Sequence, residues 1–219
     1  MLVILAGVYG LIAGLAAPRA VDFATGGSSS VQSPARRGPG YGLGVGGVLC
    51  GVCASTAYTV GWRPELMLWL AAAWLLVVLA CVDLTVRRLP DMITLPLAAL
   101  VVAGLALVSQ LPRAEGSFAA SVLGAVLLAG GYFLLFLAVP DGIGFGDVKA
   151  ALATGAMAGW YGWHPFVVGA LTAPLLGVGY VLVMHGRGRR AGRRGPVTFA
   201  YGPFLTLGAW AGVLVGAGR

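Results

Sequence analysis

Charged residues are scarce in this 219-residue chain, and their scarcity excludes a soluble protein. Only 10% of the residues are charged and 59% are hydrophobic, whereas soluble domains carry about 25% charged residues. With a mean hydropathy of +0.92, the composition cannot supply a solvated surface, so we predict an integral membrane protein. The long apolar runs lack the alternation of barrel strands, which favours helices over a closed barrel.

Cysteine is also rare, and all three cysteines lie inside apolar segments. Cys50 and Cys53 form a single Cys-x-x-Cys pair, and Cys81 lies in another run. A structural zinc site needs four ligands, and the pair lacks two of them, so we interpret it as core packing. The placement does not indicate a disulfide scaffold. We predict no metal and no organic cofactor.

Several catalytic motifs are absent. The sequence contains no Gly-x-Ser-x-Gly, no His-Glu-x-x-His and no phosphate-binding loop, which argues against serine, zinc and nucleotide chemistry. The net charge of +7 does not require nucleic acid, because the arginines lie in short loops between apolar runs. We therefore predict the lipid bilayer, and no nucleic acid, as a partner.

Eight apolar runs follow one another and predict an all-α bundle of about seven to eight transmembrane spans within a single membrane domain, residues 1–219. Spanning takes about 20 residues, so the shorter, Gly/Ala-rich sixth run is the weakest candidate. The runs cover residues 1–17, 41–61, 66–82, 92–111, 118–139, 148–163, 164–184 and from 199 to the C-terminus.

The basic residues fall almost entirely on one side if all eight runs cross. The side with the loops 18–40 and 185–198 holds eleven of the fourteen, and the opposite side holds three. This bias predicts that both loops are cytoplasmic. Four aspartates then lie at the cytoplasmic membrane face: Asp83, Asp91, Asp141 and Asp147.

Two further patterns concern packing and the membrane interface. Trp160, Tyr161 and Trp163 predict an aromatic belt at the side opposite these aspartates. Small residues recur at four-residue spacing, which lets helices approach closely in lipid. The pairs are Gly10/Gly14, Gly42/Gly46, Gly155/Gly159 and Gly208/Gly212.

Asp83 and Asp147 stand out because each lies at the end of an apolar run. An ionisable residue there is expensive, so it is a functional hypothesis by default. Two carboxylates brought together share a proton, and such a pair can activate water with one group and protonate an amide with the other. From position alone, the alternative is that each aspartate caps a helix or pairs with an arginine such as Arg87 or Arg88.

The stretch from 139 to 149 around Asp147 is rich in glycine. Gly144 and Gly146 lack a Cβ, so we expect an extended substrate backbone to approach there. Lys149 either helps to hold Asp147 ionised or anchors at lipid headgroups. Three roles are open for Asp91: it influences the ionisation of the aspartate pair, it contacts substrate, or it is a solvated loop acid.

Three stretches resemble the type IV prepilin peptidases, the bacterial branch of the GxGD aspartic membrane proteases. They are Val82-Asp83 with Arg88-Leu89-Pro90-Asp91, then Gly142-Ile143-Gly144-Phe145-Gly146-Asp147-Val148-Lys149, and finally Tyr201-Gly202-Pro203-Phe204-Leu205. The resemblance covers the chain from about residue 66 onward. It implies that Asp83 and Asp147 are catalytic. It also implies that the enzyme cleaves the leader of prepilin-like substrates just after a glycine at the cytoplasmic membrane face.

The long form of that family has a zinc-holding cytoplasmic domain between its first two spans and also N-methylates the new N-terminus. Here residues 18–40 occupy that place and contain no cysteine, so methyltransferase activity is not predicted.

Two rival functions stay open from the residues alone. A proton- or cation-coupled transporter would use the same aspartates, with inverted repeats and acids near the midplane. A non-catalytic assembly subunit would tolerate the loss of either aspartate. The sequence predicts no oligomeric state.

Overall fold

The computed structural model describes residues 1–25, 39–138, 143–190 and 199–218. Within these residues the chain forms eight α-helices and no strand, which confirms the predicted all-α class. The helices are α1 (Leu2–Ala24), α2 (Pro39–Val60), α3 (Glu65–Val86), α4 (Asp91–Val108), α5 (Phe118–Ala138), α6 (Phe145–Gly159), α7 (Trp163–Arg190) and α8 (Gly202–Ala217).

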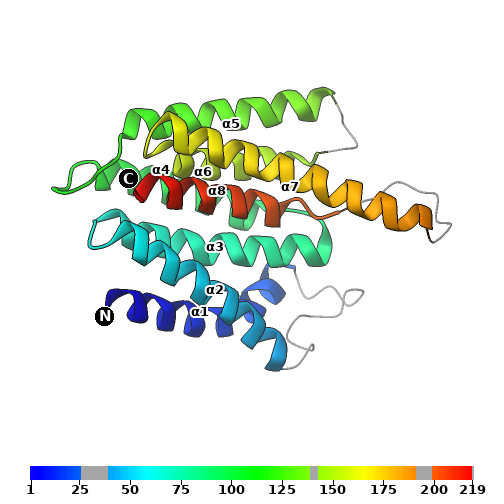
Figure 1. Ribbon diagram of the computed structural model, residues 1–219, viewed down its shortest axis with the longest axis horizontal. Coiled ribbons are helices and arrows are strands. Elements are labelled where there is room, and N and C mark those ends of the chain that lie inside the picture. The colour runs from blue at the N-terminus through cyan, green and yellow to red at the C-terminus, as the bar shows by residue number, and fades with distance from the viewer. Residues whose placement is uncertain (26–38, 139–142, 191–198, 219) are drawn as a thin grey trace.

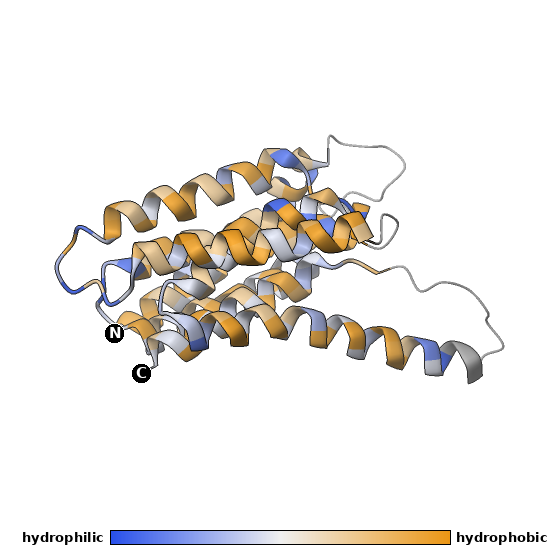
Figure 2. Cartoon of the chain, turned by 90° about the horizontal axis from the view of Figure 1, so that it is seen from above, coloured by the Kyte–Doolittle hydropathy of each residue, from blue (hydrophilic) through white to orange (hydrophobic). Residues whose placement is uncertain are grey.

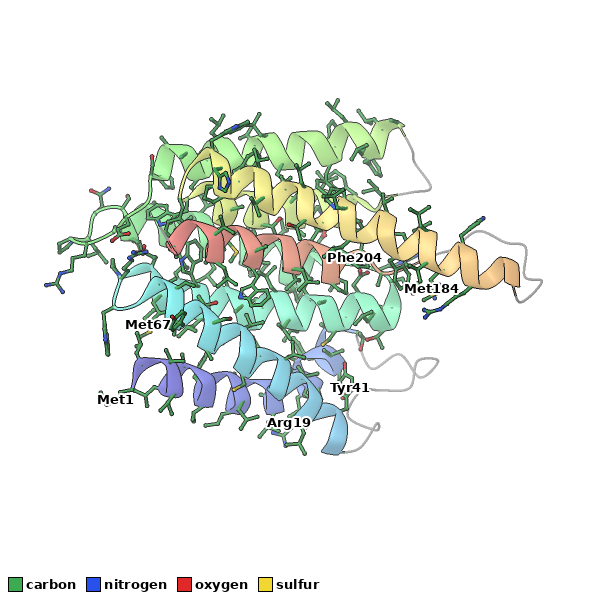
Figure 3. All side chains as sticks on the ribbon, in the orientation of Figure 1. Met1, Arg19, Tyr41, Met67, Met184 and Phe204 are labelled. Atoms are coloured by element: carbon green, nitrogen blue, oxygen red, sulfur yellow. The ribbon has the colours of Figure 1, made fainter. Side chains whose placement is uncertain are left out.

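Successive helices run antiparallel, so their connections alternate between two ends of the bundle (Figure 1). In Figure 3, Met1 and Met67 lie toward one end, and Tyr41, Phe204 and Met184 lie toward the other. The second end also contains the C-terminus of α3 and the N-termini of α4, α6 and α8. The topology therefore brings the residues that surround both predicted catalytic aspartates to one end of the molecule.

Most of the helices suit a bilayer. Six of them, α1 to α5 and α7, are long and apolar enough to cross a membrane, and α8 is a shorter apolar helix of 16 residues. Figure 2 shows apolar residues along the helices and hydrophilic residues gathered mainly near their ends. The chain is a multi-pass membrane protein, and the bundle agrees with the predicted seven to eight spans.

Helix α6 differs from the others because it is short and lies inside the bundle. It has 15 residues, and nearly every residue from Asp147 to Gly159 is buried. It packs against α4, α5, α7 and α8. Alanine and glycine dominate its sequence, and such small residues allow neighbouring helices to approach closely. The start of α6 is therefore held from several sides.

The spaced glycines lie at close helix contacts, as predicted, except Gly42, where a Cβ would make only an ordinary contact of 3.7 Å with Pro18. A Cβ placed on Gly155 of α6 would lie 2.5 Å from the carbonyl oxygen of Gly124 on α5, and one on Gly10 of α1 would lie 2.6 Å from that of Leu49 on α2. Gly208 of α8 approaches α7 in the same way. No other residue fits these contacts without moving a backbone.

Two helices extend beyond their predicted boundaries. Helix α1 continues through Pro18 to Ala24, so the first part of the predicted 18–40 loop is helical. Val21 is fully buried there, and this packing offsets the hydrogen bond that Pro18 cannot donate. Helix α7 likewise continues to Arg190, into the predicted 185–198 loop. The segments 26–38 and 191–198, and with them parts of both loops, lie outside the described residues.

The predicted aromatic belt is wrong at Trp160, whose side chain is fully buried. Its indole lies directly against Gly116, in the space that a Cβ on that glycine would occupy. The Ser117 N–H also donates to the Trp160 carbonyl at 2.9 Å. Trp163, by contrast, is largely exposed, as a residue at a membrane interface would be. Hydropathy and position do not distinguish these two environments.

Candidate active site

Asp83 lies in the last turn of α3 and is buried, with 5% of its surface exposed. The C-terminal end of a helix disfavours a negative charge, so the carboxylate needs donors from elsewhere. The Gly202 N–H, at the start of α8, donates to Asp83 Oδ2 at 2.6 Å. The backbone N–H of Tyr201 interacts with the same carboxylate. These amides belong to the helix start, where N–H groups lack intrahelical partners.

Gly202 suits this arrangement because it has no Cβ. A Cβ at this position would lie 3.0 Å from Asp83 Oδ2 and 3.1 Å from Asp83 Cβ. Such a contact is tighter than ordinary van der Waals packing, so a larger residue would push the carboxylate by a few tenths of an ångström. Pro203 follows at the second helical position, where its missing N–H is not needed.

Asp147 lies in the first turn of α6 and is also buried, with 8% of its surface exposed. Its Oδ2 accepts a hydrogen bond from the Gly144 N–H at 3.1 Å. In return its own N–H donates to the Gly144 carbonyl at 3.0 Å. The side chain is therefore anchored to the backbone that precedes its helix, and a negative charge in this turn is favoured by the helix dipole.

The two carboxylates are electrostatically coupled, because the charge of Asp83 acts on Asp147. They come from α3 and α6, and α8 packs against both helices. The residues just before α8 therefore lie between the two halves of the candidate site. Asp141, the fourth predicted acid, lies outside the described residues.

Sequence reasoning missed Tyr132, which joins this site from α5. Its hydroxyl lies 2.8 Å from that of Tyr201, and the two ring centroids are 5.8 Å apart. Tyr132 is buried, with 5% of its surface exposed. The charge of Asp147 acts on both phenols. A tyrosine in an otherwise apolar run is the signal that could have drawn attention to this position.

Lys149 and Asp91 pair with each other. The Lys149 Nζ lies 2.7 Å from Asp91 Oδ1, and it also lies over the ring of Phe145, 5.0 Å from the ring centroid. The lysine ammonium is thus directed to α4 and away from a direct contact with Asp147. The Asp91 side chain is 61% exposed, in keeping with an acid at the membrane surface.

The two glycines before Asp147 have different surroundings. A Cβ on Gly146 would lie 2.7 Å from Leu89 Cβ and 3.0 Å from the Leu89 carbonyl oxygen. Packing within this chain therefore fills the space that we expected substrate to use at this position. A Cβ on Gly144 would meet its closest neighbour, Asp147 Oδ2, at an ordinary 3.5 Å. Approach of a substrate backbone stays a prediction for Gly144.

The site contains hydrogen-bond donors and carboxylates but no gathered metal ligands. Among the residues that the structure describes, no three His, Cys, Asp or Glu side chains come together as a metal site would require. The cysteines of α2 lie elsewhere: Cys53 is fully buried, and the sulfur of Cys50 faces Gly7 of α1. What the arrangement offers chemically is two coupled, buried carboxylates with fixed backbone donors.

The sequence is similar to proteins of a known family. A family model described as the type IV leader peptidase family matches residues 70–182, a segment that includes both aspartates. The prepilin leader peptidase/N-methyltransferase of Aeromonas salmonicida (strain A449) is 30% identical over 172 residues, covering 77% of this chain and 55% of the relative. The protein of the same name from Escherichia coli (strain K12) is 35% identical over 136 residues, covering 60% of this chain and 55% of the relative.

A third relative of that name, from Burkholderia pseudomallei (strain K96243), is 34% identical over 149 residues, covering 64% of this chain and 44% of the relative. The chain thus spans about half the length of the curated relatives it matches. No solved structure was found to match it.

Proposed function

Because the chain belongs to the type IV leader peptidase family, we propose that it is a membrane-embedded aspartic endopeptidase that removes leader peptides from prepilin-like precursors at the membrane face. The observation that supports this most is the pairing of Asp83 with Asp147. Both carboxylates are buried, each accepts a backbone hydrogen bond, and the two interact electrostatically.

The proposed reaction is hydrolysis of one peptide bond by water. One carboxylate takes a proton from the water as its oxygen attacks the scissile carbonyl carbon. The other carboxyl, protonated beforehand, gives its proton to the amide nitrogen as the C–N bond breaks. The products are a new carboxyl terminus and a new amine. Asp83 and Asp147 carry these two roles, and the reaction needs no metal or organic cofactor.

The orientation of the site belongs to the same proposal. Of the nine basic residues that the structure describes, seven lie in segments at the end of the bundle that holds both aspartates: Arg19, Arg87, Arg88, Lys149, Arg187, Arg189 and Arg190. By the positive-inside rule, this bias supports a cytoplasmic position for that end. We propose that cleavage occurs after a glycine at the cytoplasmic face of the bacterial inner membrane, and that residues 18–40 and 185–198 are cytoplasmic segments of a single membrane domain.

The relatives are also named as N-methyltransferases, and the proposal is limited to the peptidase. The aspartate pair accounts for hydrolysis and does not account for methyl transfer. The transporter alternative is disfavoured by position, because Asp83 and Asp147 lie in terminal helical turns and such transporters bind their ions near the midplane.

Leader removal in cells tests the proposal. The chain is co-expressed with a prepilin precursor, and processing is followed for the wild type, Asp83→Asn and Asp147→Asn. We expect processing by the wild type and loss of processing in both variants. Glu115→Gln is the matched control, because this exposed carboxylate at the opposite end pairs with Arg63 at 2.6 Å. Processing by either aspartate variant would disprove the catalytic assignment and leave an assembly subunit as the better reading.

A further inference from the structure

The Tyr132–Tyr201 hydroxyl pair has one more proton than its own hydrogen bond uses. Each phenol carries a single O–H that can donate, and each oxygen can also accept. One proton lies between the two oxygens, which are 2.8 Å apart. The second proton needs an acceptor beyond the pair, and an unused donor is costly in a buried environment.

The pair lies beside the aspartates. Tyr201 directly precedes Gly202, whose N–H donates to Asp83 Oδ2 at 2.6 Å, and the charge of Asp147 acts on both phenols. Tyr201 also contributes its backbone N–H to Asp83, which places this residue between the two halves of the site. Hydrogen bonds to an ionised acceptor are stronger than neutral ones, and a water molecule can carry such a bond across a gap.

The two carboxylates are not equally supplied with donors. Asp83 receives backbone N–H groups from Gly202 and Tyr201, whereas the side chain of Asp147 receives that of Gly144. Lys149 does not make up the difference, because its ammonium binds Asp91. Among the described residues, the charge of Asp83 on α3 acts on Asp147, and Asp147 acts on Tyr132 of α5 and Tyr201 before α8. Asp91 of α4 is paired with Lys149.

We propose that the Tyr132–Tyr201 pair is a positioning element of the active site, which directs its second phenolic proton toward the Asp147 carboxylate and thereby sets how the two aspartates share their proton. This inference rests on the proposed peptidase function. The two hydroxyl groups, one on α5 and one just before α8, thereby influence the aspartates of α3 and α6. The phenols act through Asp147 and do not themselves contact the reacting bond.

The test removes one hydroxyl at a time and keeps the rings. Tyr132→Phe and Tyr201→Phe preserve the aromatic cluster, in which Tyr201 packs against Phe199 and Phe204. Tyr180→Phe is the matched control, because Tyr180 contacts the same two phenylalanines. Each protein is purified in detergent, and its kinetics on a purified prepilin precursor are measured across a pH series.

We expect each of the two site variants to lower kcat by about 10- to 100-fold with KM within about twofold, the size of effect typical of a lost hydrogen bond to a charged group. Without the donor the ionised carboxylate is less stable, so a higher pH is needed to populate it. The acid limb of the pH–rate profile should therefore move to higher pH. The double variant should be no slower than the slower single variant, because the pair acts as one unit.

Three outcomes overturn the proposal. Wild-type kcat in both variants would show that the hydroxyls are not used. A lower kcat with an unchanged pH profile, accompanied by a lower melting temperature, would assign the pair a purely structural role. If the wild-type protein itself does not cleave the precursor, the proposed peptidase function is wrong, and the role of the tyrosine pair is wrong as a consequence. Should one variant not fold, the other tests the same pair.

Discussion

The Gly202 N–H reaches Asp83 Oδ2 across 119 positions of sequence, at 2.6 Å. This hydrogen bond connects the N-terminus of α8 to the C-terminal turn of α3 and is the shortest one that holds a predicted catalytic carboxylate. Glycine suits this position, because a Cβ at 202 would lie only 3.0 Å from Asp83 Oδ2 and press on the carboxylate.

Gly202→Ala should therefore reduce leader cleavage, because its Cβ pushes the carboxylate by a few tenths of an ångström. The loss should stay below the about 100-fold expected when a reacting group moves by a whole ångström. Cleavage rates of the purified variant measure this effect. Gly179→Ala on α7, where a Cβ meets nothing within 4 Å, is the control and should cleave at the wild-type rate. A fully active Gly202→Ala protein would show that Asp83 does not need its present position.

The two glycines of the Gly144-Phe145-Gly146-Asp147 motif should respond differently to alanine. Gly146→Ala forces a Cβ against Leu89 and should destabilise the protein by roughly 1–3 kcal/mol, as overpacking usually does. Gly144→Ala introduces no such clash, and its φ of −78° suits any residue, so stability should be retained.

Thermal melting in detergent distinguishes the two glycine variants. If Gly144→Ala melts as the wild type does but cleaves more slowly, the substrate backbone passes close to Gly144. Equal melting temperatures for the Gly144→Ala and Gly146→Ala variants would contradict the packing that we describe around Leu89.

The Lys149–Asp91 ion pair should contribute little to stability. Its carboxylate is 61% exposed, and exposed pairs are worth about 0.2–1 kcal/mol. A double-mutant cycle with Asp91→Asn and Lys149→Met measures the coupling energy. We expect a value in that range, with leader cleavage by Asp91→Asn reduced less than about threefold. A complete loss of cleavage in Asp91→Asn would instead make this acid part of the catalytic machinery.

The orientation of the active site can be tested by labelling single introduced cysteines in intact bacteria. Arg88 lies in the connection between α3 and α4, at the end that holds Asp83, and Glu115 lies in the connection between α4 and α5, at the other end. An impermeant maleimide should modify Glu115→Cys in whole cells and Arg88→Cys only after lysis. The unaltered chain, with Cys53 and Cys81 buried, gives the background. The reverse pattern would place the aspartates outside the cytoplasm.

Much of the fold was predictable because hydropathy dominates a membrane protein. Each apolar run corresponds to a helix, since the backbone in lipid must satisfy its own hydrogen bonds. The helix ends were less predictable. Pro18 lies within α1 because packing at residues such as the buried Val21 outweighs the missing hydrogen bond. Arg187 lies within α7, since arginine is a good helix former and its charge ends the apolar run without ending the helix.

The candidate site was predictable only in part. Asp83 and Asp147 stood out because a carboxylate is conspicuous in an apolar chain, whereas the hydroxyl of Tyr132 is a weaker signal, since tyrosine is itself largely apolar. The partner of Lys149 could not be inferred, since it lies 58 positions away on another helix. Trp160 was misplaced because a tryptophan next to a turn can face lipid headgroups or the core, and only the contact with Gly116 decides between them.

The glycine-rich stretch that ends at Asp147 shows which features follow from the sequence and which follow only from the tertiary structure. Composition and charge by themselves predicted a helical membrane protein with two aspartates at one end, because lipid penalises every polar group that lacks a hydrogen-bond partner. Only the tertiary structure decided that Gly146 accommodates Leu89, that Gly202 holds Asp83, and that Tyr132 meets Tyr201. Those relationships depend on which helices become neighbours, and close packing of small residues sets that through contacts between positions far apart in the chain.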